Sequence, residues 1–126
     1  MNWNVIGAVL LAVAVVLGAF GAHGLRDRLD PYAMGLWEKA VFYHFIHAMG
    51  VLVVSLLPRT QTFPAPAAAN VCWLLTVGIL IFSGSLYALA LTGARTLGMI
   101  TPLGGVAFIA GWLLLAYYFA AQRAAV

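Results

Sequence analysis

Charged residues are scarce in this sequence. Lysine and arginine number 6 and aspartate and glutamate number 3 among 126 residues, so 7% of the chain is charged and 65% is hydrophobic. A soluble globular domain carries about 25% charged residues. The composition therefore excludes an ordinary soluble domain and indicates an integral membrane protein.

Cysteine and acidic residues are nearly absent as well. The single cysteine, Cys72, lies within an apolar run, which excludes an intramolecular disulfide and a thiolate metal cluster. We expect it to behave as a small buried hydrophobe. The three acidic residues, Asp27, Asp30 and Glu38, lie near the predicted membrane interface. The formal net charge of +3 is small and its cations lie mostly at the ends of apolar runs, so it indicates topology and no nucleic-acid partner.

Long apolar runs make up most of the remaining chain. A helix needs about 20 apolar residues to cross a bilayer, and the sequence has room for four such segments joined by short loops. We predict an all-α fold, a four-helix transmembrane bundle whose sequential helices run antiparallel in the lipid bilayer. One transmembrane domain, 1–126, would contain spans at about 4–23, 34–57, 68–92 and 98–121.

Local signals support these boundaries. The pair Asp30–Pro31 predicts the start of the second helix, with aspartate as the N-cap and proline at the first helical position. Pro58 predicts the end of that helix, and Gly93 predicts the end of the third span. The pair Thr101–Pro102 is typical either of the start of the fourth helix or of a kink within it.

Basic residues predict the orientation. Four of them lie at loops one and three or at the start of helix two, and two lie on the opposite side of the membrane. The positive-inside rule therefore places loops one and three in the cytoplasm and both termini outside. The residues on the side of loops one and three are Arg26, Arg28, Lys39 and Arg95. Those on the opposite side are Arg59 and Arg123.

A histidine pair stands out within residues 37–47, at the entry of the second span. At 100° per residue, Trp37, His44 and His47 share one face of this helix with small residues, whereas phenylalanine and aliphatic residues share the other. We expect the mixed face to point into the bundle, and Trp37 to lie near the membrane interface as well.

Membrane depth adds a second constraint. His23 ends the first span, Ser83 to Tyr87 lie in the last half of the third, and Thr101 opens the fourth, all on the side of loops one and three. The sequence therefore predicts one polar cluster in that half of the membrane. Its expected members are His23, Trp37, Tyr43, His44, His47, Ser83, Ser85, Tyr87, Thr101 and Gly104.

Several functions remain open for this cluster. It could lock the helices by hydrogen bonds, or bind a small ligand, a lipid or a partner helix. It could instead be a metal or haem site built on His23, His44 and His47. A third interpretation is an oligomeric transporter or proton path, since histidine can relay protons. No catalytic motif is recognisable, so we favour a non-enzymatic protein and assume no cofactor.

A family resemblance covers about Gly18 to Trp112. The sequence resembles the DUF423 family of small multi-pass membrane proteins, which includes mitochondrial TMEM-type relatives. The resemblance implies a bacterial cytoplasmic membrane or a mitochondrial inner membrane, and it implies no established activity. The residues that carry it are Gly18 to Leu25, Trp37 with Ala40, Tyr43–His44, His47–Ala48, Phe82 to Tyr87, Ile100 to Gly105 and Gly111–Trp112.

Overall fold

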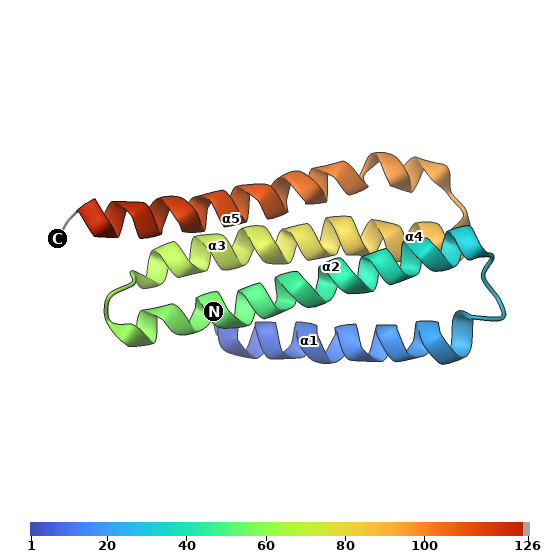
Figure 1. Ribbon diagram of the computed structural model, residues 1–126, viewed down its shortest axis with the longest axis horizontal. Helices are drawn as coiled ribbons and strands as arrows, with labels where there is room; N and C mark the ends of the chain where they lie inside the picture. The colour runs from blue at the N-terminus through green and yellow to red at the C-terminus, as the bar shows by residue number, and fades with distance from the viewer. Residues whose placement is uncertain (125–126) are drawn as a thin grey trace.

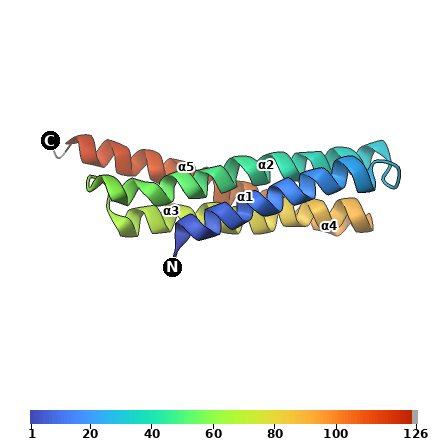
Figure 2. The ribbon, with the colours of Figure 1, turned by 90° about the horizontal axis from the view of Figure 1, so that it is seen from below.

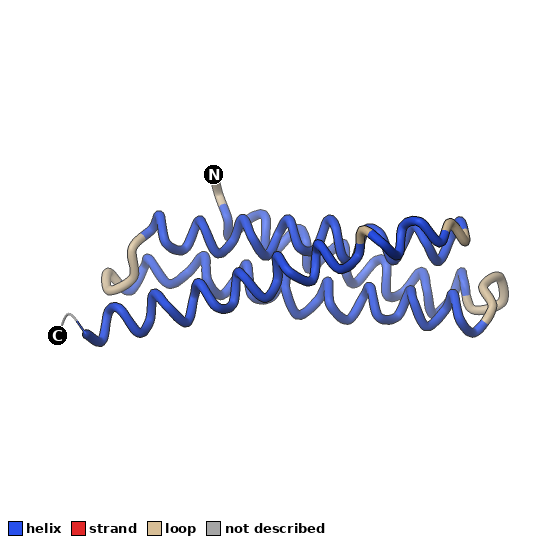
Figure 3. Tube along the Cα trace, turned by 90° about the horizontal axis from the view of Figure 1, so that it is seen from above, coloured by secondary structure: helices blue, strands red, loops and turns tan. Residues whose placement is uncertain are grey.

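The protein folds into four long antiparallel helices, which a computed structural model describes over residues 1–124 (Figure 1). Each is long and apolar enough to cross a membrane, which confirms the predicted all-α four-helix bundle. Loops one and three lie at one end and loop two lies at the other, and both the start of α1 and the end of α5 point toward the loop-two end (Figures 1 and 3). The elements are α1 (Trp3–Phe20), η1 (Gly21–Leu25), α2 (Pro31–Leu56), η2 (Leu57–Thr60), α3 (Ala65–Gly78), η3 (Ile79–Ser83), α4 (Gly84–Thr92), η4 (Arg95–Met99) and α5 (Thr101–Ala124).

The predicted helix signals are present. Asp30 caps α2 by accepting a 2.8 Å hydrogen bond from the backbone N–H of Ala33, and Pro31 opens the helix. Gly93 ends α4 in the left-handed region, at φ +68°, where a side chain would be strained. A 3-10 turn, η4, precedes α5, which begins at Thr101, so Pro102 lies in the first turn, where its missing N–H is harmless.

Two of the spans contain a π-helical turn. The segment η1 ends the first span, and η3 joins α3 to α4 within the third. A π turn closes i to i+5 hydrogen bonds, so it shifts the face presented by every residue that follows it. This shift matters most for the third span, because Ser83, Ser85 and Tyr87 lie at or beyond η3.

The second span and the third span form the centre of the molecule. The helix α2 packs against α3, η3 and α4, while α1 packs mainly on α2 and α5 packs mainly on α3 and η3. The helices α1 and α5 lie on opposite sides of this central pair (Figures 1 and 2). We call the meeting of α1, α2 and α4 the α1 junction, and the meeting of α2, the third span and α5 the α5 junction.

The core is built from small and branched side chains. Val51, Val71, Cys72 and Leu75 are fully buried between the central helices. The Cys72 thiol donates a 3.6 Å hydrogen bond to the carbonyl of Val51, in agreement with its predicted role as a small buried residue. A second, smaller cluster surrounds Trp37 near loops one and three.

Glycines allow the outer helices to approach the centre closely. A Cβ built on Gly7 of α1 would lie 2.8 Å from the backbone nitrogen of Leu52 in α2. A Cβ on Gly104 of α5 would collide with the backbone of Phe82 in η3. Without a hydrophobic force between helices in lipid, such backbone contacts supply much of the packing energy.

Replacing Gly104 by alanine should therefore separate α5 from η3, because backbone atoms cannot move aside as a flexible side chain can. We expect Gly104→Ala to lower the free energy of unfolding in detergent by about 1–3 kcal/mol, as overpacking commonly does. The control is Gly105→Ala, whose Cβ would meet only the Phe82 ring at 3.8 Å. Equal unfolding midpoints for the two variants would contradict the close approach.

Candidate functional site

Trp37 is the most heavily engaged side chain at the end of the bundle near loops one and three. It is 3% exposed, and its indole N–H donates a 3.0 Å hydrogen bond to the carbonyl of Leu17 in α1. Its ring lies 4.7 Å from that of Tyr87 in α4. Gly21 leaves room for it, since a Cβ there would come within 2.5 Å of the indole. Trp37 therefore joins three helices from within the bundle.

His44 lies in the same α1 junction, about two turns after Trp37 in α2. Its Nδ1 atom lies 3.0 Å from the hydroxyl of Tyr87, so the pair connects α2 to α4. The imidazole also lies near the backbone of Leu10 in α1. Its Nε2 atom is buried and has no hydrogen-bond partner within residues 1–124. His44 thus contributes one interhelical bond.

His47 belongs to the other junction. Its Nδ1–H donates a 2.6 Å hydrogen bond to the carbonyl of Tyr43 in the same helix, which fixes the tautomer because a carbonyl can only accept. Its ring stacks on Phe108 of α5, with centroids 3.4 Å apart and planes 12° apart. Gly78 of α3 leaves room for Phe108, because a Cβ there would collide with the Phe108 ring. His47 therefore packs in the α5 junction.

The hydroxyl groups bind other helices. The Ser83 hydroxyl donates a 2.8 Å hydrogen bond to the carbonyl of Ala40, which joins η3 to α2. The hydroxyls of Ser85 and Thr101 lie 2.6 Å apart and join α4 to α5. Each of these hydroxyl groups thus has a hydrogen-bond partner within the bundle. Buried polar groups in a membrane need such partners, because water is excluded there.

The predicted single cluster is divided in the structure. His23 is exposed at the end of the first span and does not join the other polar residues. Tyr43 is 37% exposed and packs on Phe82, at a ring distance of 4.5 Å. Gly104 serves the helix contact described above. The remaining residues separate between the two junctions.

The three histidines consequently do not converge. The rings of His44 and His47 enter different junctions, and the exposed His23 approaches neither. No group of three or more His, Cys, Asp or Glu side chains in the described part of the chain is placed to hold a metal ion. In this arrangement His23, His44 and His47 do not come together as three ligands of one metal ion. The two rings part because His44 bonds Tyr87 of α4, whereas His47 bonds the carbonyl of Tyr43 and stacks on Phe108 of α5.

The structure reveals a groove that the sequence analysis missed. It runs between the end of the first span and the first half of α2, and its volume is about 450 Å³. Apolar side chains form most of its wall, Trp37 lines it, and one acid and one base lie along it. One signal in the sequence could have indicated this groove. Residues spaced four apart share one helix face, and three lining residues have this spacing: Gly18, Ala22 and Arg26. The lining residues are Gly18, Ala22, Arg26, Met34, Trp37, Glu38, Val41, Phe42, Phe45 and Ile46.

A double-mutant cycle tests the bond between His44 and Tyr87. We expect His44→Ala and Tyr87→Phe each to lower the unfolding free energy in mixed micelles. Their coupling energy should be about 0.6 kcal/mol and at most about 1.7 kcal/mol, the range of interhelical hydrogen bonds in membranes. Tyr117→Phe is the control, because Tyr117 is 65% exposed on α5. A coupling no larger than that between His44→Ala and Tyr117→Phe would contradict the bond.

Comparison with known proteins places the chain among bacterial membrane proteins. A family model described as "Protein of unknown function (DUF423)" matches residues 17–105. A "UPF0382 membrane protein" of Staphylococcus epidermidis is 51% identical over 111 residues, which cover 88% of each chain. The "UPF0382 membrane protein YwdK" of Bacillus subtilis is 43% identical over 111 residues, covering 88% of this chain and 89% of that protein. No solved structure matches significantly. The matched residues include Trp37, His44, Ser83 and Tyr87, and the chain belongs to the DUF423 family.

Proposed function

We propose that this small integral membrane protein is non-enzymatic and binds one phospholipid molecule in the groove between α1 and α2. The observation that carries the proposal is the combination of apolar walls with the charged side chains of Arg26 and Glu38. An acyl chain fits the walls, and a headgroup fits the charges. The volume of about 450 Å³ lies within the range of about 300–1,000 Å³ that ligand sites usually have.

The position of the groove in the bundle supports a membrane ligand. It extends along α2 from Met34 to Ile46, twelve residues, which at ~1.5 Å each amount to about 18 Å. Phe42 and Ile46, at its deeper end, are 60% and 44% exposed. Side chains with such exposure in a transmembrane helix face lipid, so an acyl chain can enter from the side.

The buried polar residues have a supporting role in this proposal. Their hydroxyl and imidazole groups are engaged between helices, as the bonds of Ser83 and His44 illustrate. Tyr87, which bonds His44, also packs on Trp37. These contacts hold the wall of the groove in place. In this proposal the ligand binds in the groove and not among the buried polar residues.

A partner helix is the second candidate occupant. Gly18 and Ala22 lie four residues apart along the groove, and small residues at this spacing permit close helix approach. A second copy of the chain or another membrane protein would then cover the groove. A solute path has weaker support, because in the opposite half of the membrane the Ser55 hydroxyl is bonded to the carbonyl of Leu52 in its own helix.

We also propose that the protein lies in the bacterial cytoplasmic membrane with loops one and three inside. A reporter fused to the C-terminus should therefore be active only if it functions outside the cytoplasm. Reporters in loop one should give the opposite result, since the basic residues Arg26 and Arg28 favour the cytoplasmic side. Cytoplasmic activity of the C-terminal fusion would contradict this orientation.

Filling the groove should remove the lipid. In native mass spectrometry after mild detergent extraction, we expect the wild-type chain to retain one phospholipid and Ala22→Phe to retain none, because the added ring occupies the groove. Ala12→Phe is the matched control, since Ala12 is exposed on the same helix and does not line the groove. Undiminished retention by Ala22→Phe would contradict lipid binding. Loss of a dimer in that variant would favour the partner helix.

A further inference from the structure

We propose that the occupant of the groove is a phospholipid whose headgroup carries a primary amine, with the phosphate bound by Arg26 and the ammonium bound by Glu38. This inference rests on the proposed function and specifies the headgroup at the same site. It follows from the presence of one acid and one base along a groove whose other lining residues carry no formal charge.

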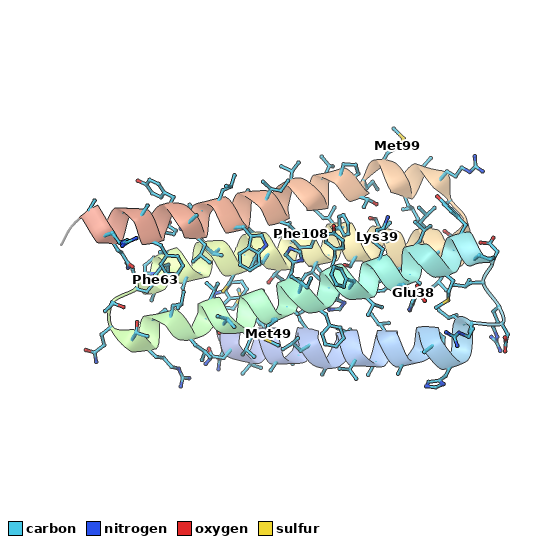
Figure 4. All side chains as sticks on the ribbon, viewed as in Figure 1. Glu38, Lys39, Met49, Phe63, Met99 and Phe108 are labelled. Carbon is cyan, nitrogen blue, oxygen red and sulfur yellow. The ribbon has the colours of Figure 1, made fainter. Side chains whose placement is uncertain are left out.

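Glu38 has an unusual position for an acidic residue. It lies seven residues after Pro31, the first residue of α2, which corresponds to about 10 Å along the helix axis. Its side chain is exposed on the surface of the bundle and lines the groove. In Figure 4 it lies on the side of α2 toward α1, whereas Lys39 lies on the opposite side. A charged carboxylate near lipid is costly and needs a cationic partner.

Arg26 approaches the same region from the other helix. It follows η1 directly and keeps helical backbone angles, with φ −55° and ψ −37°. Helical side chains lean toward the N-terminus of their own helix. Because α1 and α2 are antiparallel, Arg26 leans into the membrane while Glu38 leans toward loop one. The two charged groups therefore approach a common depth along the groove.

A zwitterionic headgroup carries a negative phosphate and a positive amine. The phosphate matches the positive charge of Arg26, and the amine matches the negative charge of Glu38. The guanidinium of arginine is permanently charged, and its fork of N–H donors fits phosphate oxygens. A primary ammonium donates charge-assisted hydrogen bonds to a carboxylate, and a quaternary ammonium has no N–H to donate. A headgroup with a phosphate but no amine would leave Glu38 beside an anion, which disfavours it.

Two other cavities at the surface of residues 1–124 differ from the groove in their charged residues. The cavity between α2 and α5, lined by Met49 and Trp112 among others, contains no charged residue. The cleft at loops one and three contains Arg28 and Arg95, but the carboxylate of Asp30 there already caps α2. We therefore place the phosphate and the amine in the groove between α1 and α2.

The test is competition between lipids that share the same acyl chains. The wild-type protein is reconstituted with equal amounts of phosphatidylethanolamine, phosphatidylcholine and phosphatidylglycerol, and the bound lipid is identified by native mass spectrometry. We expect about a tenfold preference for the ethanolamine lipid, the effect of about one charge-assisted hydrogen bond. N-acetylation of that lipid, which removes the ammonium, should abolish the preference without any change to the protein.

Variants then assign the two roles. Glu38→Gln should lose the preference for the ethanolamine lipid while still retaining lipid, and Arg26→Gln should lower the occupancy of all three. Lys39→Gln and Arg28→Gln are the controls, because neither residue lines the groove. Equal binding of the three lipids by the wild-type protein, or a preference that survives acetylation or Glu38→Gln, would overturn the headgroup assignment. It would leave the groove as a lipid site, whereas retention of lipid by Ala22→Phe would overturn the site itself.

Discussion

The burial of Trp37 is the contact on which the end of the bundle near loops one and three depends. The indole belongs to α2, donates to the carbonyl of Leu17 in α1, and packs on Tyr87 of α4. It fits only because Gly21 has no side chain. Moving it would separate α1 from α2, break the contact with Tyr87 and open the smaller core cluster. Because the same residue lines the groove, the groove has a wall that the core itself holds rigid.

Three pairs of polar groups join helices of this bundle. Ser83 bonds the backbone of α2, Ser85 bonds Thr101 of α5, and His44 bonds Tyr87. In a bilayer these groups have no water to compensate for a lost partner, so they favour one arrangement of the helices. The charges of Arg26 and Glu38 lie outside this network, at the surface. This separation is why we assign scaffold roles to the buried residues and recognition to the groove.

Much of the fold follows from the sequence, and part of the site does not. Hydropathy predicts the four spans, and Asp30–Pro31 and Gly93 mark helix ends by local chemistry that tertiary contacts do not change. The buried face of α2 also follows from the helical period. The division of the polar residues between two junctions does not follow from the sequence, because it depends on which helices pack against each face of α2 in the folded chain. Nothing local in the sequence predicts the π turn η3 either. The exposure of His23 does not follow from the sequence, which predicts its depth, because its direction depends on how η1 ends the first span. The groove depends on the register of α1 against α2, which only the folded chain defines.

A structure determined by crystallography or electron microscopy in a native lipid environment tests the central claim most directly. The account predicts one elongated density along α2 from Glu38 toward Ile46, with headgroup density beside Arg26 and Glu38. A groove covered by a helix of a second chain, or one without ordered density while lipids are resolved elsewhere on the bundle, would contradict it.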